Sequence, residues 1–127
     1  MNKLVLVIFG GGAGAAARYV VGSLAGRLLG SAWPYGTLIC NLIGGLAMGV
    51  LVGILAHRGG ADQERWRLLL GVGVLGGFTT FSAFSLETAL MIEESRYGQA
   101  LGYATASVVL SVLALFLGLY LTRRVLG

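Results

Sequence analysis

Four long apolar runs constrain the fold of this 127-residue chain more than any other feature of its sequence. They cover roughly residues 4–29, 36–56, 68–92 and 100–122. A helix needs about 20 apolar residues to cross the hydrocarbon core of a bilayer, and each run reaches that length. Only 11% of the residues are charged, against about 25% in soluble domains. We therefore predict an all-α membrane protein, in which residues 1–127 form one domain of four transmembrane helices.

The basic residues predict how this domain is oriented. With four crossings, both termini and the loop over residues 57–67 share one side of the membrane. That side carries six lysines and arginines: Lys3, Arg58, Arg65, Arg67, Arg123 and Arg124. The other side carries Arg27 and Arg96, and also Arg18 if its side chain extends outward. By the positive-inside rule we expect cytoplasmic termini and a multi-pass location in the cell inner (plasma) membrane.

Several classes of function are excluded by composition. The net charge is +4, but the nine lysines and arginines are scattered over helix ends and form no basic cluster, so nucleic acid is not an expected partner. Cys40 is the only cysteine and His57 the only histidine. Because this leaves no metal or acid–base constellation, we expect no enzyme activity.

Glycines recur every four residues along the apolar runs, as in Gly10/Gly14 and Gly45/Gly49. The pattern continues at residues 22, 26 and 30, at residue 53, and at residues 73 and 77. Small residues at this spacing let helix backbones approach closely in lipid. The start of the chain also imitates a dinucleotide-binding turn, but the acidic residue expected about 20 residues later is missing, since the first acid is Asp62. Four short helices cannot enclose a wide pore, so we expect a narrow conduit at an interface between subunits.

The third apolar run contains a segment that should interrupt its helix. Residues 76–88 combine two glycines with a series of hydroxyl side chains. In lipid, each unpaired backbone group costs several kcal/mol, so broken helices persist where they line a cavity or bind an ion. This segment is therefore the first candidate for a functional site.

Three polar residues at membrane depth are further candidates. Arg18 either extends toward the far interface or provides a fixed positive charge at the mouth of a pore. Asn41 is either a contact between helices or a hydrogen-bond donor to an anion. Glu87 is the only acid at membrane depth, and it either lies at the mouth of a vestibule or pairs with Arg18.

Aromatic rings and hydroxyl groups supply weaker polar candidates. Phe81 and Phe84 are neighbours on one helix face, and the edge of an aromatic ring carries partial positive charge. The hydroxyls of Thr80 and Ser82 flank these rings. In the fourth run a stripe with four-residue spacing consists of Tyr103, Ser107 and Ser111. Such serines either bond the carbonyl four residues earlier or form a polar track.

These residues resemble the Fluc family of fluoride channels, also called CrcB, over essentially the whole chain. The resemblance includes the glycine-rich first run ending in ARY at residues 17–19. It continues through GTL at 36–38 and NLIGG at 41–45. Its most specific part is the string GGFTTFSAFS at residues 76–85.

The resemblance implies an antiparallel dimer of four-helix subunits with two fluoride pathways along the subunit interface. Phe81 and Phe84 would face fluoride with their ring edges, and Asn41 would donate a hydrogen bond. Arg18 would make a vestibule electropositive. A structural Na⁺ would be held at the interrupted helix by the backbone carbonyls of Gly76 and Thr79 from both subunits. The hydroxyl track would be formed by Tyr103, Ser107 and Ser111.

Two features of the chain depart from the family pattern. Ala83 stands where members commonly have a hydroxyl residue, so one pathway hydroxyl is missing. The basic residues are distributed six to three at best, whereas a chain that inserts in both orientations should be nearly balanced. We favour a homodimer over pairing with an oppositely oriented paralogue.

The resulting expectation is a passive, selective fluoride channel that exports fluoride from the cytoplasm. One alternative is a proton-coupled cation or multidrug exporter of the small dual-topology type, which needs an acidic residue in its first helix. Here that helix carries Arg18 and no acid. A purely structural subunit of a larger membrane complex is the third possibility, and it would leave the polar stripe without a purpose.

Overall fold

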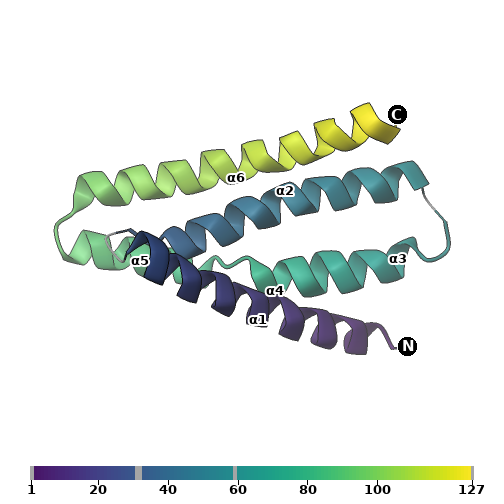
Figure 1. The fold of residues 1–127 in the computed structure, drawn as a ribbon, viewed down its shortest axis with the longest axis horizontal. Coiled ribbons are helices and arrows are strands. Elements are labelled where there is room, and N and C mark those ends of the chain that lie inside the picture. The colour runs from purple at the N-terminus through teal and green to yellow at the C-terminus, as the bar shows by residue number, and fades with distance from the viewer. Residues whose placement is uncertain (1, 31–32, 59, 127) are drawn as a thin grey trace.

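The chain folds into a bundle of helices that run back and forth along one direction (Figure 1). The computed structural model describes residues 2–30, 33–58 and 60–126, and all regular secondary structure in them is helical. These residues contain four helices long and apolar enough to cross a membrane: Lys3–Leu29, Tyr35–Arg58, Gln63–Glu93 and Tyr97–Leu126. The prediction of an all-α membrane protein with four spans is confirmed. Both termini and the connection near residue 60 lie at the same end of the bundle.

Three of the four spans are single helices. They are α1 (Lys3–Leu29), α2 (Tyr35–Arg58) and α6 (Tyr97–Leu126). Their ends extend a few residues beyond the apolar runs, because polar and basic residues continue the helical backbone. Gly30 ends α1 with a φ of +83°, a conformation that glycine adopts without strain.

The third span is built from several segments. It begins with α3 (Gln63–Trp66), continues as the π-helix η1 (Arg67–Leu75), and passes into the short α4 (Gly76–Phe78). Thr79 then adopts an extended backbone, with φ −88° and ψ 159°. Helix α5 (Ser82–Glu93) restarts at Ser82, where the Thr80 hydroxyl accepts a hydrogen bond from the Ala83 amide at 3.1 Å. Residues 79–81 therefore separate two helical segments.

Glycines bring the helix backbones into direct contact. A Cβ on Gly10 or Gly14 of α1 would overlap a carbonyl oxygen of η1, from Leu69 or Val74. A Cβ on Gly49 of α2 would overlap the Leu115 carbonyl of α6. The close-packing prediction is confirmed for these positions. It is wrong for Gly26 and Gly30, where a Cβ would meet nothing within 4 Å.

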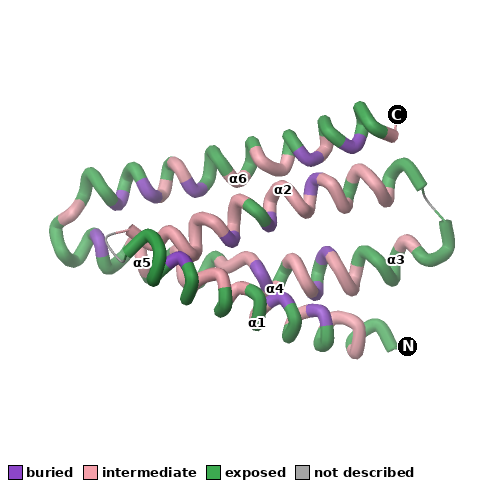
Figure 2. Tube along the Cα trace, viewed as in Figure 1, coloured by how far each residue is buried: buried purple, intermediate pink, exposed green. Residues whose placement is uncertain are grey.

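The buried core of a single chain is small. Tyr103, Met91 and Ala100 form its cluster, against which Trp33, Leu38 and Phe84 pack. Figure 2 shows buried residues only as short intervals along each helix, with exposed residues over the outer faces of α1 and α6. Many large apolar side chains are exposed, including Phe9 at 68% and Phe116 at 60%. Such a surface suits hydrocarbon, because lipid tails are as apolar as these side chains.

Candidate functional site

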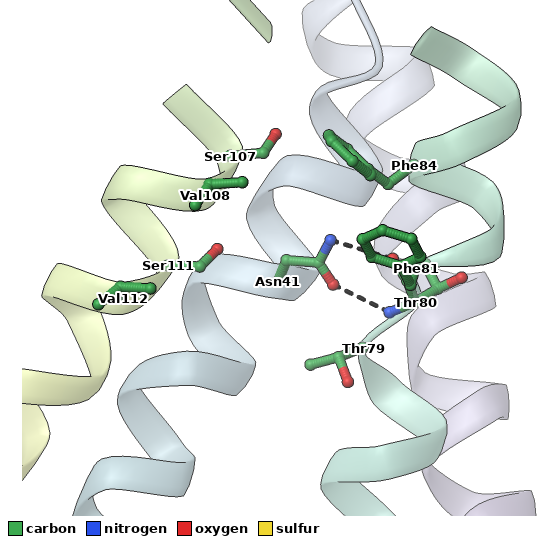
Figure 3. Close-up of a pocket in the computed structure, with 9 residues that line it drawn as sticks. All are labelled: Asn41, Thr79, Thr80, Phe81, Phe84, Ser107, Val108, Ser111 and Val112. Atoms are coloured by element: carbon green, nitrogen blue, oxygen red, sulfur yellow. Dashed lines mark hydrogen bonds between the residues drawn. The ribbon is translucent and has the colours of Figure 1, made fainter. Parts of the chain in front are cut away.

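A cavity of about 320 Å³ lies beside residues 79–81. Its walls come from α2, from the end of α4 to the start of α5, and from α6 (Figure 3). The lining residues are Asn41, Thr79, Thr80, Phe81, Phe84, Ser107, Val108, Ser111 and Val112. Six of the eight residues that the sequence nominated for an ion pathway line this one cavity, whereas Ser82 and Tyr103 do not.

Asn41 fastens α2 to the segment between α4 and α5. Its Oδ1 accepts a hydrogen bond from the Thr80 amide at 2.9 Å, and its Nδ2 donates to the Thr80 carbonyl at 3.2 Å (Figure 3). The side-chain amide thus replaces the helical partners that residue 80 lacks. Because an amide nitrogen carries two N–H donors, one N–H of Asn41 remains for a ligand in the cavity. The two sequence interpretations of Asn41, interhelical contact and donor, are therefore compatible.

The two phenylalanines face the cavity from the start of α5. Their ring centroids are 5.4 Å apart, and the ring planes are inclined by 46°. The Phe84 ring centroid also lies 5.4 Å from that of Tyr103, and Phe84 packs against the buried cluster that contains this tyrosine. Phe81, in contrast, is 75% exposed in the single chain. One ring is therefore held by the core, and the other stands at the open side of the cavity.

Ser107 and Ser111 place two hydroxyl groups along the α6 wall of the cavity (Figure 3). Both Oγ atoms are buried and have no hydrogen-bond partner among the described residues. Other helical hydroxyls bond the carbonyl four residues earlier, as Thr88 does to Phe84 at 2.9 Å and Thr122 to Gly118 at 3.2 Å. The serines do not follow this pattern. A buried polar group without a partner is costly, so a ligand in this cavity would find two available hydroxyls.

Tyr103 continues the α6 stripe but belongs to a different cluster. Its ring is completely buried, and its hydroxyl donates to Glu87 Oε1 at 3.1 Å. Thr37 Oγ1 donates to Glu87 Oε2 at 3.1 Å. Glu87 thus accepts two hydrogen bonds and makes no ion pair with Arg18 among the described residues. The suggested Arg18–Glu87 pair is wrong, because each side chain has other partners.

Arg18 and Glu87, both nominated for a vestibule, line separate neighbouring cavities. Arg18 is half-buried and faces a cavity of about 320 Å³ with Thr37, Thr80 and Ala83 on its walls. Its Nε donates a hydrogen bond to the Gly77 carbonyl at 3.1 Å. Glu87 lines a cavity of about 390 Å³ toward the end of the bundle. Gly22, Gly36 and Thr37 line both cavities.

Comparison with known proteins assigns this arrangement to a family. A family model described as "CrcB-like protein, Camphor Resistance (CrcB)" matches residues 5–119. The chain belongs to this family. A relative from Caulobacter sp. (strain K31), named "Fluoride-specific ion channel FluC", is 66% identical over 98% of each chain. Relatives of the same name from Phenylobacterium zucineum (strain HLK1) and Caulobacter vibrioides (strain NA1000 / CB15N) are 65% and 59% identical, again over 98% of each chain.

In this CrcB-family chain, the segment that follows η1 has carbonyl groups suited to a hard cation. The carbonyl oxygens of Gly76 and Thr79 accept no hydrogen bond from the described residues. The Thr80 amide, which would bond Gly76 in a continuous helix, donates to Asn41 instead. The Ala83 amide, which would bond Thr79, donates to the Thr80 hydroxyl. Uncommitted carbonyl oxygens are the ligand type that Na⁺ accepts, so these residues fit such an ion.

The structure adds residues that sequence reasoning did not nominate for this CrcB-family site. Thr37 holds Glu87, and its polar side chain near the start of an apolar run was the available signal. Val108 and Val112 also line the cavity, and each directly follows one of the two serines in the sequence of α6. The nominated Ser82 lies outside the cavity, and its hydroxyl is 3.3 Å from that of Thr80.

Proposed function

We propose that this chain forms a fluoride-selective passive channel that exports fluoride from the cytoplasm and lowers its intracellular concentration. The observation that carries the proposal is the pair of buried Ser107 and Ser111 hydroxyls, which lack a hydrogen-bond partner in the described part of the chain and share one cavity with the phenylalanine rings. The name that the relatives bear supports fluoride as the transported ion. No covalent step or energy source is required, because hydrogen fluoride that enters and ionises inside is expelled as the anion by the membrane potential.

Several weak donors suit fast passage of a strongly hydrated anion. The ion must exchange its water shell for protein groups, yet it must not be held so tightly that it stops. The serine hydroxyls, the spare N–H of Asn41 and the ring edges of Phe81 and Phe84 offer this kind of contact. In a narrow passage the same groups disfavour larger halides.

We further propose that the channel is an antiparallel homodimer with pathways along its subunit interface. Three residues that line the cavity are largely exposed in the single chain: Phe81 at 75%, Val108 at 57% and Val112 at 50%. A passage through lipid needs a wall on that side. A second copy of the chain would supply it, and an oppositely oriented paralogue is the less favoured partner. In this assembly Arg18 would provide positive charge in a vestibule, with Glu87 near its neighbouring cavity, and Thr80 and Ser82 would add hydroxyls near the rings.

We also propose a structural Na⁺ at the dimer centre, bound by the Gly76 and Thr79 carbonyls of both copies. The absence of hydrogen bonds to these two oxygens from the described residues supports this assignment. Replacing Na⁺ by N-methyl-D-glucamine, a cation too large for a carbonyl cage, should lower the melting temperature of the purified dimer by several degrees. Equal melting temperatures at equal ionic strength would contradict the ion site.

Fluoride efflux from liposomes that contain only the purified chain tests the function. A K⁺ ionophore sets the membrane potential, and chloride efflux is the control. We expect fast fluoride release without chloride release, and the Phe81→Ile variant should lower it at least tenfold while the dimer remains folded. Cation-driven proton exchange without fluoride release would instead support the exporter class, and wild-type flux in a folded Phe81→Ile dimer would remove this ring from the pathway.

A further inference from the structure

The carbonyl groups of residues 76–80 are not all available to a ligand. In a continuous helix the Gly77 carbonyl would accept from the amide of residue 81. Here it accepts from Nε of Arg18, 59 residues away in the sequence, at 3.1 Å. The Thr80 carbonyl is taken by Asn41. Side chains of two other helices therefore donate to the Gly77 and Thr80 carbonyls, while those of Gly76 and Thr79 accept no hydrogen bond from the described residues.

The backbone of α1 touches the same residue that Arg18 bonds. A Cβ on Gly77 would overlap the Gly11 carbonyl oxygen and would lie 3.1 Å from the Ala15 amide nitrogen. Helix α1 thus contacts the Gly77 peptide through its backbone and, further along the helix, through a charged hydrogen bond. A hydrogen bond from an ionised donor is stronger than one between neutral groups. These contacts fix the position of Gly77 against α1.

The hydrogen bond uses only the inner nitrogen of the Arg18 guanidinium. The two outer nitrogens make no hydrogen bond with the described residues, while the side chain lines the cavity shared with Thr37 and Thr80. A guanidinium has five N–H donors in a rigid, planar fork. Arg18 therefore has one nitrogen directed to the backbone and two that remain for the cavity. A lysine has a single nitrogen for both tasks.

We propose that Arg18 is a positioning residue for the interrupted span as well as a source of positive charge. Its Nε holds the Gly77 peptide, and this fixes the direction of the adjoining Gly76 carbonyl. Its outer nitrogens supply the charge in the cavity. The link to ion conduction and to Na⁺ rests on the proposed function, whereas the positioning of residues 76–80 does not.

Hydrogen exchange measured on the purified full chain tests the positioning role directly. The reporter is amide exchange in the peptide that covers residues 76–85, compared among wild type, Arg18→Gln, Arg18→Lys and Arg27→Gln. Arg27 is the matched control because it lies exposed on the same helix. Loss of one charged hydrogen bond should raise exchange in this peptide about tenfold or more in Arg18→Gln. We expect Arg27→Gln to match the wild type.

Fluoride efflux from the same preparations separates position from charge. Arg18→Gln should lose both properties, with faster exchange and lower flux. Arg18→Lys keeps the positive charge, but its single side-chain nitrogen cannot both bond the Gly77 carbonyl and place charge in the cavity. We therefore expect faster exchange, lower fluoride flux, or both. An Arg18→Lys protein that matches the wild type in both would overturn the proposal, as would unchanged exchange in Arg18→Gln. If Arg18→Gln does not fold, Arg18→Lys alone decides. Absence of flux in the wild type would refute the proposed channel and leave the exchange result valid.

Discussion

In the α2–α6 pair, Gly49 lies against the Leu115 carbonyl, and both helices continue without interruption along their length. In the pair formed by α1 and the third span, Gly14 lies against the Val74 carbonyl, yet the third span changes from a π-helix to α4 and then to an extended residue. The same kind of contact, a glycine against a carbonyl oxygen of the neighbouring helix, therefore occurs beside a continuous helix and beside an interrupted one. What differs is the presence of outside partners for freed backbone groups: Asn41 for Thr80, and Arg18 for Gly77. Glycine permits close approach, and side chains from other helices make the irregular backbone stable.

The largest expected effect on stability comes from adding a methyl group where the two continuous helices α2 and α6 touch. In Gly49→Ala the new Cβ would overlap backbone atoms of α6, which cannot move aside as a flexible side chain would. We expect destabilisation of at least about 3 kcal/mol, measured as loss of monodisperse protein and a lower melting temperature. Gly102→Ala on α6 is the control, because its Cβ would meet nothing within 4 Å. That change should stabilise the helix by up to about 1 kcal/mol, and equal effects of the two changes would contradict the packing argument.

The second largest effect on stability should come from removing Asn41, the side chain that hydrogen-bonds the irregular backbone at residue 80. Asn41→Ala removes both hydrogen bonds to residue 80 and leaves a half-buried amide and carbonyl unpaired. We expect a loss of about 2 to 4 kcal/mol and at least a tenfold reduction in fluoride efflux from liposomes. Thr88→Val removes only a local hydrogen bond on α5 and should change stability by less than about 1 kcal/mol with normal flux. An Asn41→Ala protein as stable as Thr88→Val would show that residue 80 does not need its outside partner.

The smallest effect on stability should come from the polar stripe of the continuous helix. Ser111 makes no side-chain hydrogen bond with the described residues, so Ser111→Ala should leave the free energy of unfolding unchanged or raise it by up to about 1 kcal/mol, because a buried group without a partner is removed. Fluoride efflux should nevertheless fall severalfold, because the hydroxyl faces the cavity. Ser85→Ala removes an exposed hydroxyl that lies outside this cavity, and it should leave both properties unchanged. Normal flux in Ser111→Ala would remove this serine from the proposed pathway.

The features that the sequence predicted are those set by local pattern. Apolar length identified four spans, and glycine spacing identified most of the close helix contacts. The periodicity of α6 predicted that Ser107 and Ser111 share one face, and both line the same cavity. These properties depend on residues a few positions apart, so the sequence carries them directly.

The features that the sequence did not predict depend on contacts between distant residues. The bonds of Asn41 to Thr80 and of Thr37 to Glu87 join positions 39 and 50 residues apart. Several partners are within reach of each polar side chain in an unfolded chain, and only tertiary packing selects one. The π-helix η1 also lacked a signal, since its sequence, RLLLGVGVL, is as apolar as an ordinary membrane helix. The partners of Arg18 and Glu87 are likewise distant in sequence, so the sequence left two roles open for Glu87, and the structure excludes only its pairing with Arg18.

The contact between Gly45 and Ser111 has a consequence for how the cavity keeps its width. A Cβ on Gly45 would lie 2.7 Å from the Ser111 carbonyl oxygen, so main chain meets main chain beside the cavity wall. The three atoms nearest to that Cβ are the Ser111 carbonyl oxygen, the Ser111 carbonyl carbon and the Ala114 Cβ, and none of them can rotate aside. The separation of the wall bearing Asn41 from the wall bearing the serines is thus fixed by the dimensions of the peptide backbone. In thicker bilayers or at higher temperature, α2 and α6 should therefore tilt together as a rigid body, with no change in the distance between them.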